Sequence, residues 1–243
     1  MSSSSTSRDV VYFLKRDLPL GGAELRYSLR SLQNLPHNNV WLVAPQVPDW
    51  VQNVKWVPWT QLGHIYLDLS EKYKALAAYQ GDMTDDVYVM DDDIYVIKPR
   101  EEVPLYSQSP LIHLLNVRYD DMSDQFGRSA WATYRLMQRL GWDNLMHPCQ
   151  HAPYPLTRSN IPVHLDDGGD TYEYKIFYYN WHLRQGGEVA DMMYKDPKGY
   201  DYSTVINIVN RGDGLLSSLE GRHEAVFSVL KGRFPDKGQY EAD

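Results

Sequence analysis

Short apolar runs separated by helically spaced segments dominate the first half of the chain. The runs at 10–14, 40–44 and 87–90 are rich in valine and lack the polar alternation of a half-exposed strand, whereas the run at 54–57 contains Lys55. All four runs are predicted to be β-strands, and the first is predicted to be fully buried.

Two helices are predicted between these strands. Gly21 and Gly22 open the first, in which leucines recur at 25, 29, 32 and 35 before Pro36 ends it. Ser70 is expected to cap the second, which ends near Gly81. Strands that alternate with helices predict an α/β fold with a mostly parallel central sheet flanked by helices.

The second half of the chain is less regular. Apolar runs predict strands at 111–117 and 205–209, and amphipathic spacing predicts helices at 128–140 and 219–230. The aromatic stretch at 176–183 fits either a strand or a helix.

No internal repeat or clear linker divides the sequence. Residues 9–243 are predicted to form a single domain after a polar, disordered tail at 1–8. That tail has no apolar core and is not expected to be a secretory signal. No apolar stretch approaches the roughly 20 residues needed to span a bilayer, so we expect a cytoplasmic protein.

The strongest chemical signal is three consecutive aspartates, Asp91, Asp92 and Asp93, between the apolar runs at 87–90 and 94–97. Adjacent carboxylates repel one another, and a buried strand end is a costly place for uncompensated charge. A divalent cation removes the repulsion, and carboxylate oxygens suit Mg²⁺ or Mn²⁺. If the backbone is extended, Asp91 and Asp93 share a face and bind one ion while Asp92 points elsewhere. The alternative is a solvated acidic turn.

Ligands of parallel sheets bind at the carboxyl ends of the strands. The three aspartates and the stretch at 15–17 both fall at such ends, which favours one shared site. Several basic residues are candidates for a cleft there: Lys15, Arg16, Arg26, Arg30, Lys72 and Lys74.

Charge, cysteine content and the motifs of the sequence argue against several classes of function. The net charge of −8 argues against non-specific binding to a nucleic-acid backbone. The single cysteine, Cys149, excludes an internal disulfide and a cysteine-rich zinc site. The sequence has no Walker loop, dinucleotide fingerprint or nucleophile elbow, so kinase, dehydrogenase and serine hydrolase functions lack support.

Four stretches of the chain follow the order of a known family pattern. They are residues 9–12; residues 24–32 with 40–44 and 47–50; residues 151–155 with 177–181; and residues 206–207, 234–235 and 240–241. Together they resemble the Stealth family of sugar-phosphate transferases, most specifically in Glu-Leu-Arg-Tyr-Ser-Leu-Arg-Ser at 24–31. The resemblance implies a GT-A-like catalytic domain, a nucleotide-sugar donor and a divalent metal (Mn or Mg), with the three aspartates at the family's acidic strand end.

The resemblance also suggests which residues contact the donor. Asp91 and Asp93 are the expected metal ligands. Arg26 and Arg30, one turn apart on the first helix, are expected to bind donor phosphates, unless they form an ordinary solvated helix face. Four further residues are assigned to donor binding: Asp17, Lys72, Asn207 and Asp213.

One histidine and several carboxylates are candidates for catalysis. His151 can accept a proton from an acceptor hydroxyl, although a structural histidine is the alternative. Asp92 is a candidate carboxylate, and Asp170 or Glu173 could provide a second one, but Asp170 also suits a solvated, glycine-containing loop. Family members have an acidic glycine-containing loop after the first strand, whereas here residues 15–20 contain only Asp17 as an acidic group.

The expected function is metal-dependent transfer from a nucleotide sugar to an acceptor hydroxyl on a glycan, a protein or a modified nucleic-acid base. The resemblance favours transfer of sugar 1-phosphate, which releases a nucleoside monophosphate. The altered first loop and the short chain keep glycosyl transfer open, which releases a diphosphate. A catalytically inactive sugar- or nucleotide-binding module is the alternative from another class.

Overall fold

The computed structural model of the chain describes residues 7–63, 65–118, 125–161, 172–191, 198–199, 201–218 and 223–242. The described strands are β1 (Asp9–Phe13), β2 (Val40–Ala44), β3 (Lys55–Pro58), β4 (Asp86–Met90), β5 (Ile94–Val96), β6 (Tyr106–Pro110), β7 (Met146–Pro148), β8 (Tyr154–Thr157), β9 (Ala190–Asp191) and β10 (Leu215–Ser217). The described α-helices are α1 (Ala23–Ser31), α2 (Ile65–Ala78), α3 (Leu111–Arg118), α4 (Gln125–Arg139), α5 (Tyr174–Arg184), α6 (Tyr202–Arg211) and α7 (Glu224–Arg233). Short 3₁₀ turns are η1 (Pro19–Gly22), η2 (Leu32–Asn34) and η3 (Arg158–Asn160).

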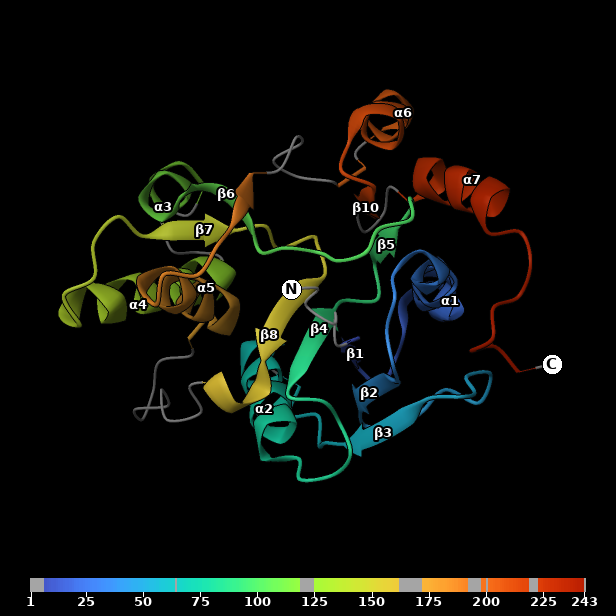
Figure 1. The fold of residues 1–243 in the computed structure, drawn as a ribbon, viewed down its shortest axis with the longest axis horizontal. Helices are drawn as coiled ribbons and strands as arrows, with labels where there is room; N and C mark the ends of the chain where they lie inside the picture. The colour runs from blue at the N-terminus through green and yellow to red at the C-terminus, as the bar shows by residue number, and fades with distance from the viewer. Residues whose placement is uncertain are drawn as a thin grey trace, which may run out of the picture.

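A five-stranded sheet in the order β3-β2-β1-β4-β8 forms the centre of the fold (Figure 1). The β3-β2, β2-β1 and β1-β4 pairs are parallel, and only β8 runs antiparallel, to β4. The predicted mostly parallel sheet is confirmed. Because Tyr12 of β1 is in register with Met90 of β4, both strands end at the same edge of the sheet.

Alternate residues of β1 divide the core between the two faces of this sheet. Val10 and Tyr12 pack with the buried leucines of α1 on one face. Val11 and Phe13 pack with buried residues of α2 and α5 on the other. The strand is buried on both faces, which explains why its sequence is a continuous apolar run. Figure 1 shows α1 and α2 on opposite sides of the strands.

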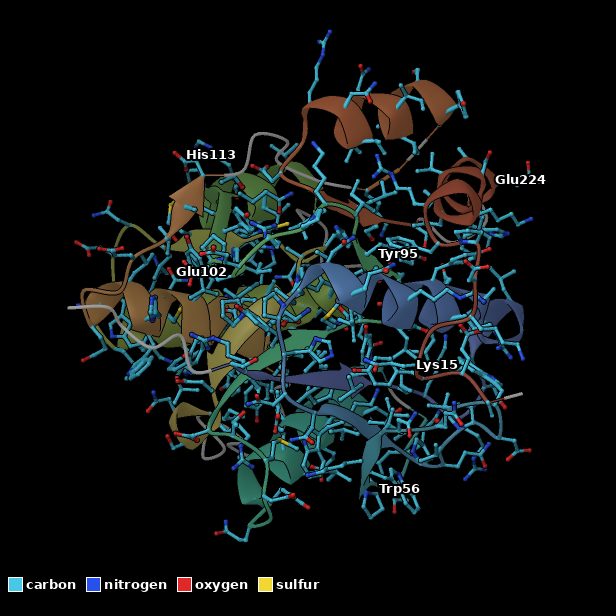
Figure 2. All side chains as sticks on the ribbon, turned by 45° about the vertical axis from the view of Figure 1, so that its right-hand side comes forward. Lys15, Trp56, Tyr95, Glu102, His113 and Glu224 are labelled. Carbon is cyan, nitrogen blue, oxygen red and sulfur yellow. The ribbon has the colours of Figure 1, made fainter. Side chains whose placement is uncertain are left out.

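The second half of the chain adds two smaller sheets and their helices. Strands β5 and β10 form an antiparallel pair covered by α6 and α7, and Tyr95 lies between α1 and these two helices (Figure 2). Strands β7, β6 and β9 form the other small sheet, near α3, α4 and α5. In the part of the chain that the structure describes, no helix combines the length and apolar character needed to cross a membrane.

Two strand predictions for the second half of the chain are wrong. The run at 111–117 is helix α3, in which Leu111 and Leu115 are buried one turn apart against the α4 region. The run at 205–209 belongs to α6, in which Asp201 caps the first turn by accepting a hydrogen bond from the Thr204 amide. Short apolar runs do not separate a buried strand from a buried helical face.

The structure also corrects the predicted helix cap at Ser70 and shows that the ambiguous stretch at 176–183 is helical. Ser70 lies inside α2 rather than at its cap, and its hydroxyl is 3.2 Å from the hydroxyl of Tyr174. The ambiguous aromatic stretch at 176–183 lies within helix α5.

A buried ion-pair cluster fastens the C-terminal segment to α1. Glu241 accepts hydrogen bonds from Arg26 Nη1 at 3.0 Å and from Arg30 Nε at 2.6 Å. The Glu241 side chain is only 1% exposed, and the Arg26 guanidinium also stacks over Trp50 at 3.8 Å. Burial alone raises the pKa of Glu241, but the hydrogen bonds of Arg30, Gly238 and Arg26 outweigh it and lower the pKa to about 2.

We predict that Glu241→Gln destabilises the protein by about 2–4 kcal/mol at neutral pH, because it leaves two arginines without their buried anion. The ionised Glu241 contributes fully to the free energy of unfolding above the ordinary glutamate pKa near 4.5, and this contribution disappears as the pH falls toward 2. The difference between the parent and Glu241→Gln should therefore shrink over the same pH range. Thermal unfolding between pH 3 and 7 measures both effects. Asp82→Asn, which removes an exposed partner of Lys55, is the control and should leave Tm unchanged. Equal Tm values for the parent and Glu241→Gln at pH 7 would contradict this role.

Candidate functional site

Asp91, Asp92 and Asp93 form a turn between β4 and β5, which we call the acidic turn. The Ile94 amide donates to the Asp91 carbonyl at 3.4 Å, and the backbone here is not extended. The strand alternation that we used to place Asp91 and Asp93 on one face is therefore wrong. The turn is not fully solvated either, because all three residues are only partly exposed.

Lys175 from the first turn of α5 is the direct partner of Asp91. Its Nζ lies 3.0 Å from Asp91 Oδ2, and the lysine side chain is 6% exposed while that of Asp91 is 38% exposed. Burial raises the pKa of Asp91, but the charge and hydrogen bond of Lys175 outweigh this effect and leave the pKa below its usual value. Asp91 is therefore a stable anion.

Asp93 is held by strand β10. The Ser217 hydroxyl donates to Asp93 Oδ2 at 3.1 Å, and the Ser218 amide donates to the Asp93 carbonyl at 3.1 Å. Burial and the negative charge of Asp91 raise the pKa of Asp93 to about 6, although His151 and Lys198 oppose the rise.

Asp92 faces two further acidic groups. Burial, followed by the charges of Asp93, Glu24 and Asp91, raises the pKa of Asp92 to about 7. Glu24 is buried in the first turn of α1 and accepts a hydrogen bond from the Ser218 hydroxyl at 2.5 Å. The acidic turn therefore concentrates more negative charge than its immediate partners neutralise.

Cations from separate elements surround this charge. Lys72 of α2 lies over the Trp59 ring at 4.7 Å, and burial lowers its pKa against the opposing effects of Asp91, Asp68 and Asp92. Lys198 Nζ lies 3.2 Å from His151 Nε2. Because an ammonium can only donate, His151 accepts at Nε2 in this arrangement. Carboxylates with cations beside them suit an anionic ligand that also carries a metal ion.

The structure brings some of the predicted residues together and separates others. Asp91, Asp92, Asp93, His151 and Lys72 share one electrostatic site.

The remaining assigned residues lie elsewhere. Arg26 and Arg30 are engaged with Glu241 instead of the acidic turn. Asn207 is exposed on α6, and the carbonyl of Asp213 accepts from Arg100. Both lie before β10, the last strand that the structure describes.

The last two predicted residues are not found at the acidic turn. Asp17 is exposed in the segment after β1, and Asp170 lies outside the described residues.

Three residues of the site were missed by the sequence analysis: Glu24, Lys175 and Lys198. The signal for Lys175 was a single cation within the aromatic stretch Tyr-Glu-Tyr-Lys-Ile-Phe-Tyr-Tyr, since buried lysines are rare unless paired. Which anion it pairs with depends on the packing of α5 against β4 and could not be deduced from the sequence.

The donor set of the acidic turn fits a hard divalent cation. Among the described residues, no group of three or more His, Cys, Asp or Glu side chains is arranged to hold a metal ion. Mg²⁺ in particular is often bound by one or two carboxylates together with substrate phosphates and water. The raised pKa of Asp93, caused by burial and the neighbouring Asp91 charge, shows an electrostatic conflict that a cation would relieve.

Comparison with solved structures identifies the fold. An active-site mutant of LgtC is similar to this chain with a TM-score of 0.50 at 11% identity, covering 95% of this chain and 98% of that one. Another LgtC structure, a galactosyltransferase in complex with donor and acceptor sugar analogs, gives 0.46 at 11% identity over the same shares. The apo form of the glycosyltransferase GlyE from Streptococcus pneumoniae TIGR4 gives 0.32 at 12% identity, covering 55% and 44%. The first similarity shows that the chain has a GT-A-like α/β fold.

No family model matches the sequence, and no curated protein sequence matches it. The resemblance to the Stealth family therefore stays a prediction.

We predict that Glu173→Gln stabilises the protein above pH 7. Glu173 is buried at the N-cap of α5, and burial raises its pKa from 4.5 to about 7. Between these pH values only the unfolded chain releases the proton, so the free energy of unfolding falls as the pH rises and stays low above 7. The full penalty is on the order of 3 kcal/mol.

Glutamine keeps the oxygen that accepts from the Lys175 amide but has no charge to bury. Thermal unfolding should therefore give a higher Tm for Glu173→Gln at pH 8 and similar values at pH 4.5. A lower Tm for the variant at pH 8 would show that the Glu173 charge stabilises the fold.

Proposed function

We propose that this protein is a metal-dependent transferase that uses a nucleotide-sugar donor. The proposal is based on the acidic turn at the carboxyl end of β4 and on the three lysines near it: Lys72, Lys175 and Lys198. Carboxylates next to cations suit a diphosphate with a bound metal, and the GT-A-like fold that this chain shares with LgtC supports transfer of a sugar.

Each group of residues has a distinct task in this proposal. Asp93 and Asp91 hold the metal, which supplies positive charge to the diphosphate of the donor. Lys72 contributes a second positive charge toward the phosphates. Asp92 or His151 takes the proton of the acceptor hydroxyl, since both lie at the acidic turn and Asp92 has a pKa of about 7, raised first by burial. For His151 this requires the Lys198 ammonium to leave Nε2 first, because a neutral imidazole has one accepting nitrogen.

Two reactions fit this arrangement. In glycosyl transfer the acceptor oxygen bonds to the anomeric carbon, the bond from that carbon to the β-phosphate oxygen breaks, and a nucleoside diphosphate leaves. In sugar-phosphate transfer the acceptor oxygen bonds to the β-phosphorus, the bond from that phosphorus to the bridging oxygen of the diphosphate breaks, and a nucleoside monophosphate leaves. The acceptor is a hydroxyl of a glycan, a protein or a modified nucleic-acid base.

Incubation with a panel of nucleotide sugars and Mn²⁺ tests the proposal through the released nucleotide. Release of a diphosphate identifies glycosyl transfer, and release of a monophosphate identifies sugar-phosphate transfer. A folded protein that binds a nucleotide sugar but releases neither product, with any acceptor class, would instead be a binding module.

We predict that Asp93→Asn abolishes metal-dependent donor binding, with a smaller loss for Asp91→Asn, because one remaining carboxylate holds a weakly bound Mg²⁺ or Mn²⁺ poorly. Calorimetry with each nucleotide sugar, with and without Mn²⁺, measures the loss. Asp85→Asn is a matched control, because Asp85 precedes β4 at the opposite end of the strand. Unchanged donor affinity in Asp93→Asn with Mn²⁺ present would reject the assignment.

We predict that His151→Ala lowers turnover by about 10²–10⁴-fold and leaves donor affinity nearly unchanged, as expected when a general base is removed. The exposed His113 on α3, labelled in Figure 2, provides the control variant His113→Ala. Turnover, donor affinity and Tm are measured on both variants. A destabilised His151→Ala enzyme with normal turnover would show that the histidine is structural.

A further inference from the structure

In the ion pair between Lys175 and Asp91, the lysine is buried and the aspartate is partly exposed. The lysine side chain is 6% exposed and the aspartate side chain 38% exposed, with 3.0 Å between Nζ and Oδ2. The ammonium therefore approaches the carboxylate from the protein interior. A cation that arrives from solvent reaches Asp91 from the exposed side.

The backbone around Lys175 is fixed on both sides by other elements. The Tyr154 hydroxyl, from β8, donates to the Lys175 carbonyl at 2.7 Å. The Glu173 amide donates to Thr133 Oγ1 of α4 at 2.8 Å, and the Glu173 side chain accepts from the Lys175 amide. This network gives the lysine a preset position, so it can orient its partner with little entropy cost.

A lysine behind a metal-binding carboxylate has two opposing effects. Its charge repels a cation, which weakens metal binding. Its hydrogen bond holds the carboxylate in one orientation, which strengthens metal binding, and loss of such an outer partner typically weakens binding 10–100-fold. The two effects predict opposite outcomes when the lysine is made neutral.

Lys72 provides the comparison that separates these effects. Its ammonium acts on Asp91 through charge, and the structure shows it over the Trp59 ring with no hydrogen bond to Asp91 in the described part of the chain. Neutralising Lys72 therefore removes charge near the acidic turn without releasing Asp91.

We propose that Lys175 is a positioning residue, which holds Asp91 from behind so that the carboxylate presents its exposed side to the metal. This inference rests on the proposed function, since it assumes that the acidic turn binds a metal ion. It gives a role in the site to Lys175, which lies in α5 just before the family-like stretch at 177–181.

The test is the affinity for Mn²⁺, with pyrophosphate standing in for the donor diphosphate, measured by the spin-resonance signal of free Mn²⁺. Lys175→Met should bind Mn²⁺ about 10–100-fold more weakly than the parent. Lys72→Met is measured with Mn²⁺ alone, because Lys72 is also proposed to attract the phosphates, and it should bind the ion equally or more tightly. In an Asp91→Asn background, Lys175→Met should cause no further loss, because the lysine acts through Asp91.

Equal or tighter Mn²⁺ binding by Lys175→Met would overturn the positioning role while leaving the proposed function intact. If Lys175→Met does not fold, as judged by its melting curve, Lys175→Gln replaces it and should still bind Mn²⁺ more weakly than the parent. If Lys175→Gln binds like the parent, the inference is wrong. A parent protein that binds no Mn²⁺, with or without pyrophosphate, would overturn the metal-dependent function and this inference together.

Discussion

Mutual repulsion among carboxylates at the end of β4 is the constraint around which the site is arranged. Asp91, Asp92 and Asp93 follow one another in a partly buried turn, with Glu24 close to Asp92. Such a concentration of charge is unfavourable unless neighbouring elements compensate it. Lys175 compensates Asp91 directly, and the raised pKa values of Asp92 and Asp93, for which burial is the largest cause, show that the compensation is incomplete.

The parallel sheet and the irregular second half have different tasks in this arrangement. The sheet places the ends of β1 and β4 at one edge, because Tyr12 and Met90 are in register. Separate segments of the second half place their side chains next to the aspartates of the acidic turn. Lys175 from α5 contacts Asp91, Ser217 from β10 contacts Asp93, and the His151–Lys198 pair acts on Asp93 through charge. The ionic cluster at Glu241 is independent of them and fastens the chain end to α1.

The sequence predicted the four parallel strands of the central sheet and the acidic residues after β4, because apolar runs and charge clusters are local signals. It did not predict the antiparallel strand β8 within the Pro- and His-rich stretch at 147–162. It failed for 111–117 and 205–209, where a short apolar run does not distinguish helix from strand. It did not reveal Glu241 as the partner of Arg26 and Arg30, because Glu241 is more than 200 residues away in the chain. Lys175 was missed for the same reason, since its partner is 84 residues away.

Anomalous scattering from crystals soaked with Mn²⁺ and a nucleotide sugar locates the cation without relying on activity. If the acidic turn binds the metal, a manganese peak should lie about 2 Å from carboxylate oxygens of Asp91 and Asp93 and in contact with the donor phosphates. A nucleotide sugar bound away from the acidic turn, or a manganese peak that contacts neither aspartate, would contradict this assignment.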